Sequence, residues 1–339
     1  MRKIRLPLLQ YPGTRLPYVR ATRVTTHVEH TPHPEPGGAS DSADAGAQVV
    51  AVIVTRHRPD TLPRSLRALS SQCRRPDHVV VVDNGPDAEV PGLLADGGLP
   101  WTYLPSQRNL GGAGGFALGI LHALALGADW VWLADDDGYP VGDDVLDTLL
   151  ATAREHQLGM VSPLVVDADD HDRLAFPLRR GASWATARDE LGGGMLPGYA
   201  ALFNGALFSA GALERVGVPD LRLFVRGDEV DMHRRVARSG VAFGTALDVS
   251  YAHPTGQLEW RETLGGRSRV LVPDDDAKRF FTFRNRGFLT SQPGMRRYAA
   301  FDLLRYAWYF LAQRRDPAAF RDWARLTREG RAERFSRPG

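Results

Sequence analysis

Runs of consecutive apolar residues recur through the middle of the chain, and each is followed by polar residues. The runs cover residues 49–54, 79–82, 101–104 and 130–133, and the first two are rich in valine. Such runs are typical of strands buried on both faces of a parallel sheet. Helical spacing of leucines at 62–69 and an apolar segment at 113–126 predict helices between the strands. The alternation predicts an α/β domain with a mainly parallel, Rossmann-like sheet flanked by helices.

Polar side chains stand where two of these strands end. Asp83 and Asn84 follow the second strand, and Asp135, Asp136 and Asp137 follow the fourth. Ligands of open parallel sheets bind beyond the carboxyl ends of the strands. We therefore expect these five side chains along one edge of the sheet.

The aspartate run 135–137 is the strongest chemical signal. Two carboxylates one residue apart can hold a hard divalent cation while phosphate oxygens complete its shell. A cation placed there neutralises a diphosphate leaving group. The alternative is a solvated acidic loop, with Asp143 and Asp144 capping the next helix. A second run, 274–276, precedes a helix start and is assigned to capping.

A glycine-rich loop at 109–116 leads into the helix predicted at 113–126. Its backbone N–H groups could approach an anion or a nucleotide closely. Gly112, Gly114 and Ala117 also satisfy the dinucleotide-binding fingerprint, which suggests an NAD-dependent oxidoreductase as an alternative. That fingerprint belongs after the first strand of a domain, however, and here it follows the third.

Acidic residues also open a predicted helix at 228–235. Asp228, Glu229 and Asp231 can serve there as a fixed general base for an acceptor hydroxyl, or can simply compensate the helix dipole. His253 ends the apolar segment 249–252, and a neutral imidazole there suits a manganese-like ion. A lone histidine is more often structural than a ligand.

The segment 280–286 combines aromatic residues with Arg284 and Arg286 on a predicted helix. These guanidinium groups could meet a diphosphate. The alternative is a core helix with a solvated basic edge.

Charge is unevenly distributed along the chain. The net charge is only +2, but residues 1–23 contain no acid, and arginine is again abundant from 296 onward, which suggests an anionic partner. The single Cys73 excludes an intramolecular disulfide and a cysteine metal cluster, and agrees with a reducing compartment. The sequence has no secretory signal and no apolar stretch long enough to span a bilayer. We therefore expect a cytoplasmic protein, or one bound peripherally to a membrane.

Taken in order, these motifs resemble those of glycosyltransferase family two, the inverting enzymes with the GT-A fold. The resemblance covers residues 48–290. It leaves 1–47 as an N-terminal extension and linker, with a short strand pair near Val24 and Val28, and 291–339 as a basic, aromatic helical segment.

The resemblance assigns roles by position. It implies a Mn²⁺ or Mg²⁺ ion held by Asp135, Asp137 and His253. Glu229 stands at the position of the catalytic base, where the family usually has Asp, so Asp228 competes for that role. The residues implied to bind the nucleotide-sugar donor are Thr55, Arg56, Asp83, Asn84, Arg108, Asn109, Gly112, Asp135 and Asp136.

Within the family, the glycine loop and the aspartate run most resemble galactofuranosyltransferases of actinobacterial cell-wall galactan. The fit is best to the smaller enzyme that starts the galactan chain. That resemblance implies UDP-galactofuranose as donor and a polyprenyl-diphosphate-linked GlcNAc-rhamnose acceptor. The nearest rival is a rhamnosyltransferase that uses dTDP-rhamnose.

A lipid-linked acceptor would explain the basic, aromatic tail. Apolar residues recur at helical spacing over 297–311, next to Arg305, Arg314 and Arg315, and such a helix can lie in an anionic leaflet at the inner face of the plasma membrane. The stripe consists of Tyr298, Phe301, Leu304, Trp308 and Leu311. It could equally pack on the catalytic domain or form a dimer contact.

Two non-enzymatic functions are alternatives to a glycosyltransferase. A nucleic-acid binder would use the basic ends, but the acidic edge in the middle of the chain argues against it, and we expect no nucleic-acid partner. A non-catalytic sugar-nucleotide binder would share the donor site and would lack a functional base.

Overall fold

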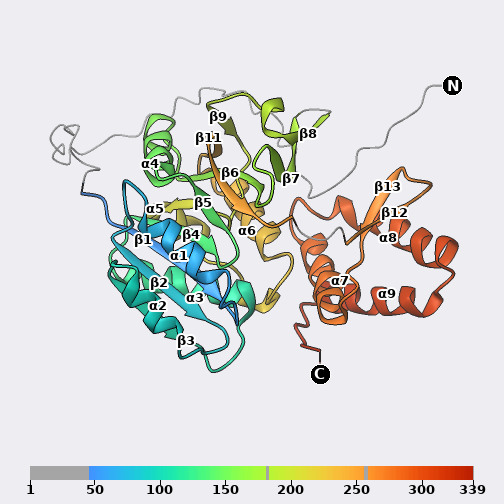
Figure 1. Cartoon of the computed structure of the whole chain (residues 1–339). Coiled ribbons are helices and arrows are strands. Elements are labelled where there is room, and N and C mark those ends of the chain that lie inside the picture. Colours follow the sequence, from blue (N-terminus) through green and yellow to red (C-terminus); the bar gives the residue numbers. More distant parts are fainter. Residues whose placement is uncertain (1–45, 181–182, 256–258, 339) are drawn as a thin grey trace, which may run out of the picture.

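The computed structural model describes residues 46–180, 183–255 and 259–338, and Figure 1 shows a sheet domain beside a smaller C-terminal group of elements. The main sheet has the order β3-β2-β1-β4-β10-β6-β11-β5, and helices cover it. The predicted strand pair near Val24 and Val28 lies outside the described residues, as does most of the linker. The α/β prediction is confirmed, and the boundary at residue 290 stays a prediction.

Parallel strands form the first half of the sheet, as the apolar runs predicted. They are β1 (Val49–Thr55), β2 (His78–Asp83), β3 (Trp101–Pro105) and β4 (Trp130–Asp135). β1 pairs in parallel with both β2 and β4, and every residue of β1 is buried. Burial on both faces explains the unbroken apolar sequence of β1.

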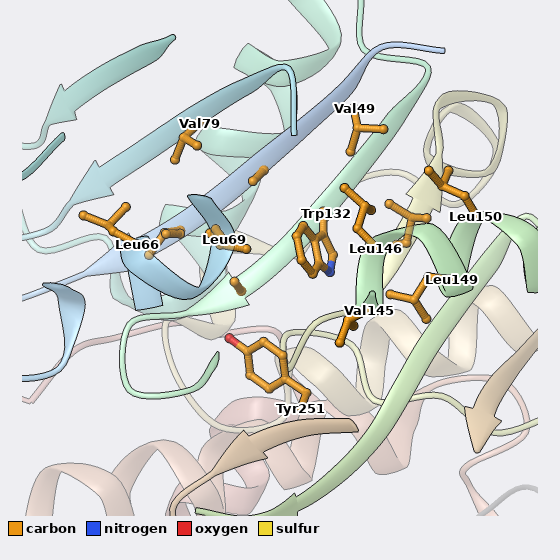
Figure 2. Close-up of a cluster of buried hydrophobic side chains, with 14 of the residues drawn as sticks. Val49, Leu66, Leu69, Val79, Trp132, Val145, Leu146, Leu149, Leu150 and Tyr251 are labelled. Carbon is orange, nitrogen blue, oxygen red and sulfur yellow. The ribbon is translucent and has the colours of Figure 1, made fainter. Parts of the chain in front are cut away.

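Helices α1 (Leu62–Ser70) and α4 (Val145–Glu155) cover one face of these strands. Figure 2 shows the Trp132 indole of β4 between leucines of both helices, and its Nε1 donates to the carbonyl oxygen of Gly205 at 2.9 Å. Helix α3 (Gly111–Ala125) belongs to the opposite core. The indole thus fills the core without leaving its one donor unpaired.

The second half of the sheet is less regular, and the apolar runs did not predict it. β10 (Leu207–Ser209) runs antiparallel to β4 and β6 (Met160–Asp167), whereas β11 (Phe243–His253) runs parallel to β6. The remaining elements of this part are β5 (Tyr139–Val141), β7 (Arg173–Arg180), β8 (Ser183–Ala187), β9 (Met195–Pro197), α5 (Ala210–Val216), α6 (Asp228–Ser239), η1 (Arg188–Glu190) and η2 (Leu221–Leu223). Helix α2 (Val90–Asp96) connects β2 and β3 in the first half.

The C-terminal elements have a core of their own. The hairpin β12 (Trp260–Thr263) and β13 (Ser268–Leu271) lies beside α7 (Asp276–Ser291), α8 (Arg297–Ala307), the π-helical η3 (Trp308–Gln313) and α9 (Pro317–Arg331). A separate cluster of buried residues joins them, with Phe283, Tyr306 and Trp323 at its centre. Asp275 accepts a hydrogen bond from the Lys278 N–H at the start of α7, so the capping prediction for this second aspartate run is confirmed.

Candidate active site

The carboxyl ends of the central strands meet at one edge of the sheet. Val54 of β1 pairs with Asp135 of β4, and the next residue, Thr55, pairs with Asp83 of β2. This register confirms that the polar residues after the second and fourth strands share one edge.

A potential metal site lies at this edge. One ligand atom from each of Asp135, Asp137 and His253 lies within 4.8 Å of the others, and His253 Nε2 is 3.4 Å from Asp137 Oδ1. The three residues meet because β5 starts directly after the aspartate run and pairs antiparallel with β11, so that Tyr139 lies opposite Ala252. Two carboxylates and an imidazole fit a divalent cation.

The electrostatics of this group favour a bound positive charge. Burial raises the pKa of Asp135 well above its usual value, and the nearby charge of Asp137 adds to the rise. Burial alone would lower the pKa of His253, but Asp137 and Asp135 outweigh it and raise that pKa. His253 Nδ1 lies 2.7 Å from the carbonyl oxygen of Pro254, an arrangement that leaves Nε2 to face the carboxylates.

The middle aspartate of the run points the other way. Asp136 Oδ2 accepts hydrogen bonds from Thr55 Oγ1 at 2.8 Å and from the Arg56 N–H at 3.3 Å, and both Thr55 and Asp136 are buried. These bonds tie the end of β4 to the loop after β1. Arg56, by contrast, is exposed at the edge.

Asp83 and Asn84 shape the neighbouring part of the edge. Asp83 is fully buried, and its two oxygens accept hydrogen bonds from the Gly85 N–H, the Asp87 N–H and the Tyr103 hydroxyl. Asn84 accepts from the Leu110 N–H and donates to the carbonyl oxygen of Gly111. Both side chains hold loops in place.

The glycine loop begins helix α3 and packs against the segment that precedes α6. Gly111 has φ +69°, and a Cβ there would lie 2.1 Å from the carbonyl oxygen of Phe224, so only glycine fits. Asn109 accepts a hydrogen bond from the Gly111 N–H, while Arg108 is exposed. A Cβ on Gly112 would lie 3.9 Å from Asp228 Oδ2, which places the loop next to the acids of α6.

The first residues of α6 differ in what they face. Glu229 accepts a hydrogen bond from the Leu202 N–H, and its charge acts on His253 and Asp135, which places it on the metal side. Burial raises the pKa of Glu229. Burial, together with the charge of Glu229, raises the pKa of Asp228 to about 7.

The third acid of this helix is structural. Asp231 is 4% exposed and forms ion pairs with Arg234 at 2.8 Å and Arg235 at 2.9 Å. Dipole compensation and ion pairing therefore account for Asp231, and they do not account for the two acids before it.

With this geometry in place, the chain can be compared with known proteins. Residues 50–210 match the model of the family described as glycosyl transferase family 2. The chain is 58% identical over 296 residues to galactofuranosyltransferase GlfT1 of Mycolicibacterium smegmatis, an alignment that covers 85% of this chain and 98% of the relative. It is 57% identical over 297 residues to GlfT1 of Mycobacterium tuberculosis H37Rv, covering 86% and 98%. This chain belongs to glycosyltransferase family 2.

A solved structure agrees with the fold of this glycosyltransferase. Residues 1–349 of S. aureus TarS, in complex with UDP-GlcNAc, superpose with a TM-score of 0.52 at 12% identity, over 85% of this chain and 88% of TarS. The oxidoreductase alternative is wrong, since the family is a family of transferases. The glycines of its fingerprint region instead let α3 approach β1, because a Cβ on Gly115 would lie 2.5 Å from Val54 Cγ1.

The arginines of α7 have a role in the glycosyltransferase that neither sequence interpretation foresaw. Arg284 is fully buried and donates to the carbonyl oxygens of Arg222 and Leu223. The amide of Asn285 also donates to the carbonyl oxygen of Leu223 and to those of Val225 and Arg226. Arg284 is therefore neither a diphosphate ligand nor a solvated edge, and with Asn285 it holds the backbone that leads into α6.

Two further residues near the acids escaped the sequence analysis. Burial raises the pKa of Asp136, and the charge of Arg58, in the loop after β1, opposes that rise; the bond with His253 lowers the pKa of Asp137, and Arg58 adds to that effect. Tyr199 is half-buried, its surroundings raise the pKa of its hydroxyl, and the charge of the nearby Glu229 adds to that rise. Arg58 could have been found, because it follows a strand at the expected ligand edge. The position of Tyr199, in the loop after β9, leaves no sequence signal.

Proposed function

We propose that this glycosyltransferase moves a sugar from a nucleotide-diphosphate donor to an acceptor hydroxyl with inversion at the anomeric carbon. The observation that carries the proposal is the Asp135–Asp137–His253 group, which lies beside Glu229 at the ligand edge of the sheet. A cation site next to a single carboxylate suits a direct displacement, because one base and one leaving group suffice. The paired acid and nucleophile of retaining glycosidases are not required.

The proposed cofactor is Mn²⁺ or Mg²⁺. Asp135 and Asp137 offer the oxygen ligands that both ions prefer, and the imidazole of His253 favours Mn²⁺. When bound, the ion supplies Lewis-acid stabilisation of the departing diphosphate. The two carboxylates repel each other, so a divalent ion bound between them would relieve that repulsion.

Glu229 is the proposed base. Its carboxylate takes the proton of the acceptor hydroxyl as the oxygen attacks the anomeric carbon, and the bond to the diphosphate breaks on the opposite face. The Leu202 N–H fixes the carboxylate, and burial keeps its pKa above the ordinary value, which strengthens it as a base. Asp228 is the second candidate, and its place beside Gly112 fits a role in shaping the donor loop.

The proposed donor is UDP-galactofuranose, because the two similar relatives are named galactofuranosyltransferases. dTDP-rhamnose is the second candidate. We propose that the exposed Arg56 and Arg108 contact the donor directly. Thr55, Asp83, Asn84, Asn109, Gly112 and Asp136 would position the loops around it, because their side chains or backbones bond or pack within those loops.

The proposed acceptor is a polyprenyl-diphosphate-linked GlcNAc-rhamnose saccharide, reached by peripheral contact with a membrane. No helix in the described ranges is both long and apolar enough to cross a bilayer. One face of α8 and η3 is nevertheless exposed and apolar, with Leu303, Leu304, Trp308 and Leu311 each 44–55% exposed. Between residues 293 and 315 the only acid is Asp302, which is buried, whereas Arg296, Arg297, Arg314 and Arg315 are exposed. This combination suits the surface of an anionic leaflet.

Cosedimentation with vesicles tests the membrane contact. We expect the full chain to bind phosphatidylcholine vesicles that contain phosphatidylglycerol, and the double variant Leu304→Ser, Trp308→Ser to lose that binding. Leu121→Ser is the matched control, because Leu121 is 56% exposed on α3 of the sheet domain. Equal binding of both variants would remove this part of the proposal.

A donor panel tests the transfer itself. With a rhamnose-terminated acceptor and Mn²⁺, we expect transfer from UDP-galactofuranose and none from dTDP-rhamnose or UDP-glucose. Transfer from dTDP-rhamnose alone would make the second candidate correct. A nuclear magnetic resonance assignment of the product's anomeric configuration would test inversion.

A further inference from the structure

A cavity lies between the start of α6 and the C-terminal elements, outside the metal and donor site. Its walls come from α6, β12, β13, α7 and α8, and they include Gly227, Val230, Trp260, Leu289, Tyr298 and Tyr306. Gly227 is the residue before Asp228, so the cavity wall runs directly into the acid pair. Glycine suits this position because its φ is +91°, and a Cβ on Gly227 would lie 3.1 Å from Leu289 Cδ1.

The charged residues of the cavity are already paired. Arg226 forms an ion pair with Glu259 at 2.7 Å, and both Arg286 and Arg305 pair with the buried Asp302. A phosphate or diphosphate ligand calls for guanidinium groups free to bind it bidentately. The cavity therefore favours a ligand without charge.

The uncharged part of the wall is aromatic and aliphatic, with a few polar atoms. Trp260, Tyr298 and Tyr306 contribute rings, and Val230, Leu271 and Leu289 contribute aliphatic groups. Two wall residues also carry buried polar atoms, Thr282 Oγ1 and Arg305 Nε, that lack a hydrogen-bond partner in the part of the chain that the structure describes. Buried polar atoms are normally paired, so these two are available to a ligand after a small adjustment of the wall. Sugar hydroxyls both donate and accept, and a sugar ring presents an apolar C–H face to an aromatic ring.

We propose that this cavity binds the saccharide of the acceptor, with the Trp260 indole against one face of a sugar ring and Thr282 bonded to a hydroxyl. The inference rests on the proposed function for the identity of the second substrate. It adds the residues that select that substrate, and it places them on the C-terminal elements, outside the metal and donor site.

Steady-state kinetics on Trp260→Ala test the proposal. The probe is a synthetic rhamnose-terminated disaccharide with a short alkyl chain, used with UDP-galactofuranose and Mn²⁺. We expect the acceptor KM to rise about tenfold or more, as loss of an aromatic contact implies, while the donor KM changes little. Trp101→Ala is the matched control, because Trp101 lies 39% exposed on edge strand β3, and we expect both of its KM values to match the wild type.

Two more variants guard against a folding defect in Trp260→Ala. Trp260→Phe keeps an aromatic face and is expected to recover most of the acceptor affinity. Thr282→Val keeps the shape and loses the hydroxyl, so the acceptor KM should rise about fivefold, the usual cost of one hydrogen bond. An unchanged acceptor KM in folded Trp260→Ala, or an equal rise in the donor KM, would overturn the proposal.

Saturation-transfer difference nuclear magnetic resonance separates this proposal from the proposed function. The disaccharide alone, without donor or metal, should receive saturation from the wild type and from Trp101→Ala, and not from Trp260→Ala. If inorganic pyrophosphate displaced the disaccharide, the cavity would be a site for an anion, and this result would also overturn the proposal. If the disaccharide binds as expected while no nucleotide sugar is used, the cavity assignment stands and the proposed reaction fails.

Discussion

Two clusters of buried charge in this protein differ in how their charges are compensated. At the sheet edge, Asp135 and Asp137 crowd one imidazole, and burial together with mutual repulsion raises the pKa of Asp135. In the C-terminal elements, Arg286 and Arg305 share the carboxylate of Asp302, and burial there is offset by ion pairs. In the first cluster Asp135 forms no ion pair within the described residues, whereas in the second cluster both arginines pair with Asp302.

The difference shows that compensation, and not the kind of charged residue, marks a site. Both clusters contain buried ionisable groups, and both were candidates for binding a diphosphate or its counterion. A buried charge without a partner costs free energy that a ligand can recover, and a paired charge offers a ligand nothing. Mutations that remove one member should therefore have opposite effects in the two clusters.

The largest effect is expected at the proposed base. Glu229→Gln keeps the shape of the side chain and removes its basicity, so kcat should fall by about 10³-fold, within the range of general-base catalysis. Steady-state kinetics with the donor at saturation measure this change, and UDP binding should persist. Glu214→Gln, on the exposed side of α5, is the control. If Asp228→Asn lost more activity than Glu229→Gln, the two acids would exchange roles.

The C-terminal cluster should depend on its one acid for stability. Asp302→Asn leaves the buried Arg305 and the half-buried Arg286 without a counter-charge, so the free energy of unfolding should fall by about 3–5 kcal/mol. Urea denaturation measures this change. Asp322→Asn, which breaks the exposed ion pair with Arg325 on α9, should cost at most about 1 kcal/mol. Similar values for the two variants would mean that Asp302 does not compensate the arginines.

Asp228 should make stability depend on pH. Its pKa is about 7 in the folded chain, above the ordinary aspartate value of 3.8, so the folded state binds the proton more tightly. The loss of folding stability that comes from ionising Asp228 is absent below about pH 4 and grows up to about pH 7. Above that pH it stays constant at no more than about 4 kcal/mol. Asp228→Asn should therefore stabilise the protein at pH 8 and much less at pH 5, as measured by urea denaturation at both values. A constant difference between the two pH values would contradict this account.

The smallest effect is expected at the metal site without metal. Because the folded chain raises the pKa of Asp135, its ionised form opposes folding at neutral pH. In a chelating buffer, Asp135→Asn should unfold at the same temperature as the wild type or a higher one. In Mn²⁺ and UDP the order should reverse, since the variant has lost a ligand. Destabilisation by Asp135→Asn in chelator would mean that this cluster, too, is complete within the chain.

Much of the first half of the fold follows from local sequence, and much of the second half does not. The valine runs of β1 and β2 mark strands buried on both faces, and Asp83 and Asp135 mark where they end. By contrast, β10 is only three residues long, and it lies between β4 and β6 through long-range pairing that no local pattern encodes.

The same division holds for the site. Spacing along the chain indicated Asp135 and Asp137, because they lie two positions apart at the end of β4. His253 could be only a weak candidate from sequence, since the long-range antiparallel pairing of β5 with β11 brings it to the aspartates. The contacts of Arg284 and Arg286 were not predictable, because their partners lie on other elements, η2 and α8, whose packing against α7 no local pattern encodes.

Thermal unfolding of the wild type and of Asp137→Ala, with UDP and Mn²⁺ together and each alone, tests whether a metal ion holds the donor diphosphate at the sheet edge. We predict that UDP raises the unfolding temperature of the wild type only when Mn²⁺ is present, and that Asp137→Ala shows no such rise. Stabilisation of Asp137→Ala equal to that of the wild type, or a wild-type response to UDP that does not depend on the metal, would contradict a metal-held donor diphosphate at the sheet edge.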